Sequence, residues 1–118
     1  MDFDAGVYLK FKIKKVSGNN FRLYVQDGTQ EETVFIYWGS SGIAYYDGTS
    51  HVIESIDTNW HTYEIYIKGT TFWFYMDGVF KYSDDVTNTL YLSPYTDIIQ
   101  FGDNFDTESI KYEIDYFN

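Results

Sequence analysis

The feature that most constrains this chain is a strict two-residue alternation of apolar and polar side chains. Between residues 7 and 16 the apolar members are Val7, Leu9, Phe11 and Ile13, and the residues between them are Tyr8, Lys10, Lys12 and Lys14. Successive side chains of a β-strand point to opposite faces, so this pattern predicts a strand with one buried and one solvated face. The stretches 60–68 and 71–76 alternate in the same way.

About ten short runs of this kind follow one another along the chain, separated by turn residues. They cover residues 7–16, 21–25, 33–38, 43–46, 51–56, 60–68, 71–76, 79–82, 90–92, 98–101 and 110–117. Ile and Val total 18 residues and Leu and Ala only 6, and β-branched side chains favour strands. We therefore predict that residues 1–118 form one all-β domain, a two-sheet antiparallel β-sandwich or jelly roll.

The strongest single hairpin signal is the dipeptide Asp77-Gly78, which lies between two of these runs. A two-residue type I′ turn needs positive φ at both central positions, which Asp-Gly tolerates. Gly69-Thr70 is expected to form a second two-residue turn.

The charge balance excludes several classes of partner. The chain has 18 acidic and 8 basic residues and a formal net charge of −10. Such a surface repels phosphate, so we expect no nucleic-acid partner and no binding to anionic membranes. No apolar stretch is long enough for a transmembrane helix, and we expect no signal peptide before the first strand. With no Cys, the chain offers neither a thiolate metal site nor a Cys nucleophile.

Two segments in the second half of the chain resemble a recurrent signature. Residues 59–65 (NWHTYEI) and 74–79 (FYMDGV) are similar to the "W-H-x-Y" strand and "Y-V-D-G" hairpin of the concanavalin A-like lectin/glucanase superfamily, which includes laminin G-like domains. Met76 stands where that signature has an aliphatic residue. Residues 99–103 and 114–117 resemble the last two strands of lectin-like modules in secreted carbohydrate-active enzymes. The resemblance implies a two-sheet jelly roll, and its motifs report a fold rather than an activity.

The first strand departs from this superfamily. Its members usually carry further strands before the one that corresponds to residues 6–16, including one that pairs with the C-terminal strand. We therefore expect either that the domain is excised from a larger surface protein or that a homo-oligomer supplies the missing edge. The expected location is extracellular or at the cell surface.

An enzymatic function is an alternative, because laminarinase-type glycoside hydrolases belong to the same superfamily. Those enzymes carry several carboxylates at alternate positions of one strand, and retaining hydrolysis needs two carboxyl groups about 5–5.5 Å apart. The only candidate pair here is Glu113 and Asp115, which lacks the second Glu and lies downstream of the H-T-Y segment. No Gly-x-Ser-x-Gly motif accompanies His51 and His61. We predict that the chain is not an enzyme, and that His61 is a structural residue bonded to a turn carbonyl.

The 26 aromatic residues exceed what a core of this size can absorb. Six of them lie in register with aliphatic neighbours and are predicted to be core: Phe11, Phe21, Tyr63, Phe72, Phe74 and Phe101. An aromatic ring can stack on the apolar face of a sugar while its polar tip stays solvated. The predicted ligand-binding residues are Trp73, Trp38, Tyr45, Tyr46, Tyr75 and Tyr24. Alternatively, these rings fill the second face of each sheet as cross-strand pairs.

One acidic loop is a candidate calcium site. Residues 103–108 offer four side-chain oxygen ligands within six residues, and Ca²⁺ prefers oxygen ligands. Asp103 and Asp106 are the predicted ligands, and Asp84-Asp85 is a weaker candidate. The alternative is a solvated acidic loop that promotes solubility.

These observations predict a non-catalytic, lectin-like module that binds a neutral polysaccharide or glycan through exposed aromatic residues. The alternative function is structural: an oligomerisation or adhesion module of a surface protein without a sugar site of its own.

Overall fold

The computed structural model describes residues 2–14, 21–28, 32–39, 42–57, 59–87, 98–102 and 110–116, the last two ranges as backbone only. Its strands are β1 (Val7–Lys14), β2 (Phe21–Asp27), β3 (Glu32–Gly39), β4 (Gly42–Tyr46), β5 (Ser50–Glu54), β6 (Trp60–Lys68), β7 (Thr71–Met76), β8 (Val79–Asp85), β9 (Ile98–Gly102) and β10 (Ile110–Tyr116). The described residues contain no helix long and apolar enough to cross a membrane. The predicted strand over residues 90–92 lies outside the described residues.

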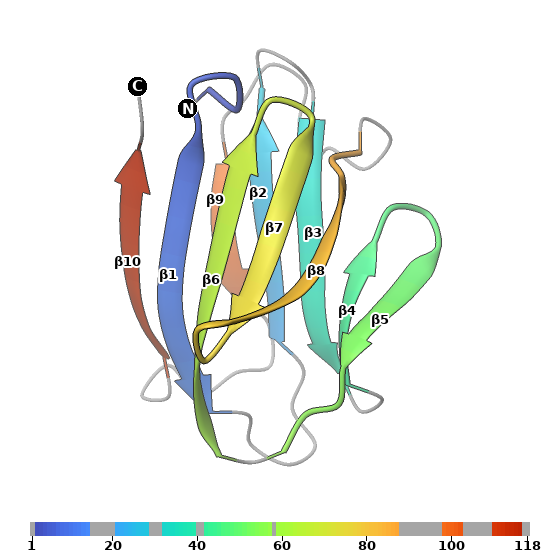
Figure 1. Ribbon diagram of the computed structural model, residues 1–118, viewed down its shortest axis with the longest axis vertical. Coiled ribbons are helices and arrows are strands. Elements are labelled where there is room, and N and C mark those ends of the chain that lie inside the picture. The colour runs from blue at the N-terminus through green and yellow to red at the C-terminus, as the bar shows by residue number, and fades with distance from the viewer. Residues whose placement is uncertain are drawn as a thin grey trace.

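The strands form two antiparallel sheets that pack face to face (Figure 1). Sheet A has the order β10-β1-β6-β7-β8, and sheet B has the order β5-β4-β3-β2-β9. The all-β, two-sheet prediction is therefore confirmed. Strand β1 pairs directly with the C-terminal strand β10, with Val7 opposite Tyr116. In the superfamily, a further strand before β1 usually pairs with the C-terminal strand; here β1 itself makes that pairing.

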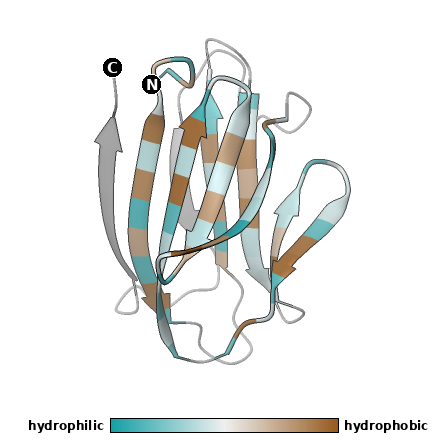
Figure 2. Ribbon diagram, in the orientation of Figure 1, coloured by the Kyte–Doolittle hydropathy of each residue, from teal (hydrophilic) through white to brown (hydrophobic). Residues whose placement is uncertain are grey.

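The alternation read from the sequence decides which side chains enter the core. Along β1, Val7, Leu9, Phe11 and Ile13 are at most 1 % exposed. Figure 2 shows the same alternation as bands of opposite hydropathy along β1, β6 and β7. Predicted core residues Phe11, Phe21, Tyr63, Phe72 and Phe74 are all buried, whereas the side chain of Phe101 lies outside what the structure describes.

Trp38 lies between the two sheets and contacts side chains of both. It extends from β3 of sheet B and is fully buried. Its ring centroid lies 5.6 Å from that of Phe11 and 5.2 Å from that of Tyr63, which belong to sheet A. The near-perpendicular geometry of both contacts is the one that aromatic quadrupoles favour.

The N-terminal residues close one end of the sandwich. Phe3 is fully buried; its amide donates a hydrogen bond to Asp27 of sheet B (2.9 Å), and its carbonyl accepts one from Gly69 of sheet A (2.7 Å). The two predicted turns also form: Gly69-Thr70 joins β6 to β7, and Asp77-Gly78 joins β7 to β8 with φ of 52° and 79°.

Gly42 at the start of β4 provides a test of this packing. Its φ is +124°, and a Cβ added there would lie 2.5 Å from the carbonyl oxygen of Glu54 in β5. We expect Gly42→Ala to combine backbone strain of about 1–2 kcal/mol with a steric cost of about 1–3 kcal/mol. Urea unfolding followed by circular dichroism measures the loss.

The matched control is Gly48→Ala. Gly48 has a similar φ of +110°, but nothing lies within 4 Å of an added Cβ, so only the strain is expected. Equal losses of stability in the two variants would contradict the close approach of Gly42 to β5.

Candidate functional site

The outer face of sheet A carries a row of aromatic side chains that crosses three strands. Tyr8 of β1 is paired with Tyr66 of β6, and Tyr66 is paired with Trp73 of β7. The rings of Tyr66 and Trp73 are stacked, with centroids 5.4 Å apart and an interplanar angle of 30°. All three side chains are half-buried, so each keeps part of its surface in solvent.

A second row lies beside the first. Tyr75 of β7 is paired with Glu64 of β6 on one side and with Phe80 of β8 on the other. The Tyr75 and Phe80 rings meet edge to face at 5.7 Å, and Phe80 is 53 % exposed. The Tyr8 hydroxyl donates a hydrogen bond to the Glu64 carboxylate. We call the set Tyr8, Tyr66, Trp73, Tyr75 and Phe80 aromatic surface A.

The outer face of sheet B carries a different aromatic cluster, which we call aromatic surface B. Its members are Tyr24, Phe35, Tyr37 and Tyr46. Phe35 lies in the middle, with ring centroids 4.3 Å from Tyr24, 5.9 Å from Tyr37 and 6.0 Å from Tyr46. Phe35 is only 8 % exposed, so the three half-buried tyrosines cover it.

The six predicted ligand-binding residues therefore do not form one site. Trp73 and Tyr75 lie on aromatic surface A, and Tyr24 and Tyr46 lie on aromatic surface B, on the opposite side of the sandwich. A single ligand cannot contact both surfaces across the core. The remaining two, Trp38 and Tyr45, are buried.

For Trp38 and Tyr45 the predicted exposure is wrong. Trp38 is paired with Phe21 and Ile43, and Tyr45 is paired with Ile36, all of which point into the core. Directly paired residues share a face, so both aromatic residues point inward as well. Burial raises the pKa of the Tyr45 hydroxyl, which donates a hydrogen bond to the Asp85 carbonyl at 2.7 Å.

Sequence reasoning missed Tyr66 and Phe80 of aromatic surface A. Tyr66 could have been found from parity, because it alternates with Ile65 and Ile67, which face the core. Phe80 could also have been found, because the predicted two-residue turn at Asp77-Gly78 places it opposite Tyr75. Beyond Phe80, a β-bulge sets Tyr82 opposite Phe74, and alternation along β8 alone does not reveal this shift.

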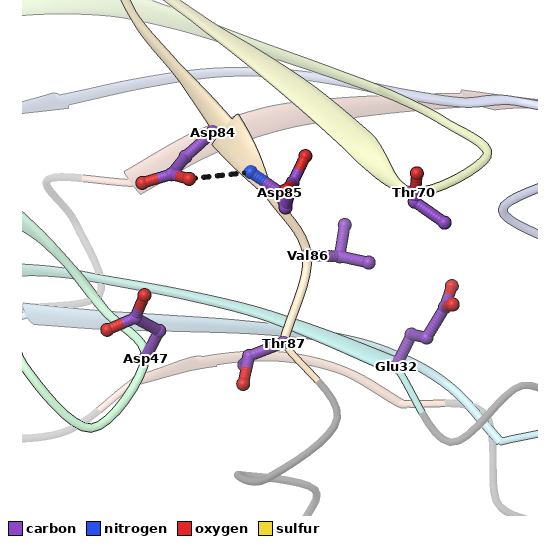
Figure 3. A pocket seen from close by; sticks show the side chains of 7 residues that line it. All are labelled: Glu32, Asp47, Thr70, Asp84, Asp85, Val86 and Thr87. Carbon is purple, nitrogen blue, oxygen red and sulfur yellow. Dashed lines mark hydrogen bonds between the residues drawn. The ribbon is translucent and has the colours of Figure 1, made fainter.

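An acidic pocket opens where the end of β8 passes from sheet A to sheet B. The segment after β8 is held by hydrogen bonds from Val86 to Thr70 (2.9 Å) and between Thr87 and Thr33 (2.7 and 3.0 Å). The pocket has a volume of about 490 Å³ and is lined by Glu32, Asp47, Thr70, Asp84, Asp85, Val86 and Thr87 (Figure 3). Burial and the nearby Asp27 and Asp4 raise the pKa of Glu32.

Two of these lining residues, Asp47 and Asp84, converge with His51. Each of the three offers one metal-ligating atom, and these atoms lie within 4.8 Å of one another. Desolvation opposes ionisation of Asp47, but hydrogen bonds from His51 and the Thr49 amide hold its pKa below the usual range. Asp84, one residue of the weaker calcium candidate Asp84-Asp85, thus belongs to this group of three metal-ligating side chains. The predicted ligands Asp103 and Asp106 lie outside the described residues.

His61 is bonded to carboxylates, which corrects the expectation of a turn carbonyl. Its Nδ1 lies 2.6 Å from Asp77 Oδ2 in the β7–β8 turn, and its Nε2 lies 2.7 Å from Asp57 Oδ1. Asp77 Oδ1 also accepts a hydrogen bond from the Thr62 amide at 2.9 Å. The two carboxylates flank the ring on opposite sides, an arrangement that fastens the turn to β6.

Comparisons with known proteins identify the fold. No protein-family profile matches the sequence, and a search of curated proteins finds no significant relative. Domains LG4-5 of the mouse laminin α1 chain match with a TM-score of 0.54 and 12 % identity, over 100 % of this chain and 38 % of that one. The Caenorhabditis elegans galectin LEC-6 matches with a TM-score of 0.51 and 11 % identity, over 98 % and 84 %. The chain has a concanavalin A-like sandwich fold. The resemblance and the jelly-roll prediction are thereby confirmed.

Alginate lyase AlgAT5 from polysaccharide lyase family 7 also matches, over 70 % of this chain and 43 % of that one, at 13 % identity. Its TM-score is 0.49. The chain spans less than half the length of the lyase and laminin structures. Sequence identities this low show a shared concanavalin A-like fold and not a shared activity.

The His61 contacts predict a pH-dependent contribution to stability. Desolvation opposes the charged imidazole, but the hydrogen bonds to Asp77 and Asp57 raise the pKa of His61 above 6.5. The hydrogen bond to His61 lowers the pKa of Asp57. Partial burial opposes ionisation of Asp77, but the hydrogen bond to His61 is among the contacts that hold the pKa of Asp77 below its usual range. The His61 contribution is complete below its ordinary pKa of 6.5 and lost as pH rises through the raised value. The carboxylate contribution is complete above 3.8 and lost as pH falls through the lowered values.

We therefore expect His61→Gln to lower the free energy of unfolding more at about pH 5.5 than at about pH 9. Urea unfolding of both proteins at the two pH values measures this difference. An equal loss at both values would show that folding leaves the pKa of His61 unchanged, which would contradict the predicted rise.

Proposed function

We propose that this chain is a non-catalytic carbohydrate-binding module that holds a glycan against aromatic surface A. The observation that carries the proposal is the stacked pair of Tyr66 and Trp73 on the solvent side of sheet A. Aromatic rings offer a flat apolar area with a polar tip, which suits the C–H face of a pyranose ring.

The polar groups around this pair suit the hydroxyls of a sugar. The Glu64 carboxylate accepts the hydrogen bond of the Tyr8 hydroxyl, and it retains further lone pairs for a ligand. Lys10 of β1 is exposed and is paired with Glu64, so a donor and an acceptor stand side by side. A formal net charge of −10 favours a neutral glycan over an anionic one.

Aromatic surface A suits a glycan better than aromatic surface B. Trp73 has the larger ring, and its neighbour on β8 is the small, exposed Ser83. Tyr66 stacks on the indole from the β6 side, and no large side chain is paired with it from the β8 side. On aromatic surface B, in contrast, the central Phe35 is covered by three tyrosines.

The fold is compatible with this function, since one structural neighbour is a galectin and another a laminin chain. As part of the proposal, the domain is a module of a larger extracellular or cell-surface protein. Catalysis is not part of it, because Glu113 and Asp115 lack the second Glu of the hydrolase pattern. Calcium bound by Asp103 and Asp106 stays a prediction.

One observation favours a structural alternative, in which the same face binds a second copy of the chain. Phe80 of β8 is 53 % exposed on this face, and exposed apolar side chains mark protein interfaces as well as ligand sites. Light scattering separates the two functions: a stable dimer that protects Trp73 fluorescence from a soluble quencher would favour oligomerisation.

The proposal predicts that Trp73→Ala weakens glycan binding at least tenfold, about 1.4 kcal/mol, because the largest stacking ring is removed. Affinity electrophoresis through gels that contain neutral polysaccharides, preceded by a glycan array, measures the effect. The matched control is Tyr24→Ala, which removes a half-buried aromatic residue from the opposite sheet and should leave affinity unchanged.

A second variant tests the geometry without removing the indole. Ser83→Phe places a ring beside Trp73 on β8 and should cover the indole surface that Ser83 leaves open, with a similar loss of affinity. Binding that survives both Trp73→Ala and Ser83→Phe would refute a site on aromatic surface A. An array without any glycan signal would refute the proposed function itself.

A further inference from the structure

Three metal-ligating side chains converge where the β4–β5 hairpin of sheet B faces the end of β8 of sheet A. Asp47 and His51 belong to the hairpin and Asp84 belongs to β8. One ligand atom of each lies within 4.8 Å of the others. We propose that Asp47, His51 and Asp84, the metal triad, bind a divalent transition-metal ion of the Zn²⁺ type.

His51 distinguishes this set from an ordinary acidic cluster. Its ring is stacked on Tyr45, with centroids 6.0 Å apart at 25°, and on Tyr82, at 6.4 Å and 29°. These contacts fix the plane of the imidazole and direct Nε2 to within 3.0 Å of Asp47 Oδ1. With its proton on Nδ1, the imidazole offers a free Nε2 lone pair beside the carboxylate oxygens, which is a donor set that Zn²⁺ accepts readily. The hydrogen bond between Nε2 and Asp47 is then given up when the ion binds.

Hydrogen bonds from neighbouring groups orient both carboxylates. Asp47 Oδ1 accepts a hydrogen bond from the Thr49 amide at 3.1 Å. Asp84 Oδ1 accepts one from the Asp85 amide at 2.8 Å, and its Oδ2 accepts one from the Tyr82 hydroxyl at 2.5 Å. Each carboxylate oxygen has more than one lone pair, so metal ligation remains available. Such outer partners hold ligands in place in known metal sites.

The acidic pocket supplies an approach route and a favourable potential. Asp47 and Asp84 lie together on one side of the segment that carries Val86 and Thr87 (Figure 3). Among the described residues that line the pocket, four carry carboxylates and none is a lysine or arginine. A cation is therefore concentrated at its wall, and the pocket leaves room for water as a further ligand.

The donor set favours Zn²⁺ over Ca²⁺. Calcium takes 6–8 oxygen ligands, whereas Zn²⁺ is satisfied by three protein ligands and a water. Tetrahedral bonds of about 2.0–2.2 Å place ligand atoms about 3.3 Å apart. The pair formed by His51 Nε2 and Asp47 Oδ1 is already near this spacing, and rotation of the half-buried Asp84 side chain would complete it.

The bound ion would connect the two sheets at the side where β8 faces the β4–β5 hairpin. Its free energy of binding would add to the stability of the folded domain, because the unfolded chain does not hold the three ligands together. This role is independent of the glycan site, which lies on the outer face of sheet A.

Isothermal titration of the metal-free protein with Zn²⁺, together with melting curves at increasing Zn²⁺, tests the proposal. We expect one site per chain and a melting temperature that rises with Zn²⁺ concentration, with Ca²⁺ at least tenfold weaker. His51→Phe keeps a ring to pack on Tyr45 and Tyr82 but removes the nitrogen. That variant and Asp84→Asn should each weaken Zn²⁺ binding at least tenfold.

Two control variants should bind Zn²⁺ as the original chain does. Asp85→Asn removes a carboxylate from the same pocket, and His61→Gln removes the other histidine. Absence of Zn²⁺ binding, Zn²⁺ affinity unchanged in His51→Phe, or Ca²⁺ binding as tight as Zn²⁺ would each overturn the proposal.

Discussion

The contact of Trp38 with both sheets is the interaction on which the rest of the structure depends. Its ring lies 5.0 Å from Phe21 within sheet B, and 5.6, 5.2 and 6.3 Å from Phe11, Tyr63 and Phe74 of sheet A. A large aromatic side chain in the middle of a sandwich sets the spacing between the sheets and brings most of its area out of water. The outer faces are therefore presented in a fixed relation to each other.

The same side-chain parity that directs Trp38 inward directs Trp73 outward. On β7, Phe72, Phe74 and Met76 enter the core, so Trp73 and Tyr75 must face solvent. An aromatic surface built on strands is rigid, because each ring is positioned by its neighbours on the adjoining strands. Such a surface can receive a flat ligand with little loss of conformational entropy, as a binding module requires.

The sequence was sufficient for the fold and insufficient for the site, for identifiable physical reasons. The clean alternation in β1, β6 and β7 is compatible with only one register, because shifting any of these strands by one residue would turn its apolar side chains toward solvent. In β3, by contrast, Phe35 and Ile36 are both apolar and both buried, so periodicity could not show which of Tyr37 and Trp38 faces the core. The convergence of Asp84 with Asp47 and His51 depends on contacts distant in sequence, and the register shift in β8 is an irregularity inside a hairpin. Neither feature could be predicted from the alternation of apolar and polar residues along a single strand.

The strand order has a consequence for how the chain reaches this structure. Strands β2 to β5 pair with their sequence neighbours, and so do β6 to β8, so both groups can form as local hairpins. Strand β1 has no neighbour of this kind: its partners are β6 and β10, and Val7 pairs with Tyr116. Closing such long loops costs conformational entropy, and strand pairings of this kind therefore form slowly. During synthesis from the N-terminus, both edges of β1 therefore stay unpaired until β6 emerges, and an unpaired strand edge favours aggregation.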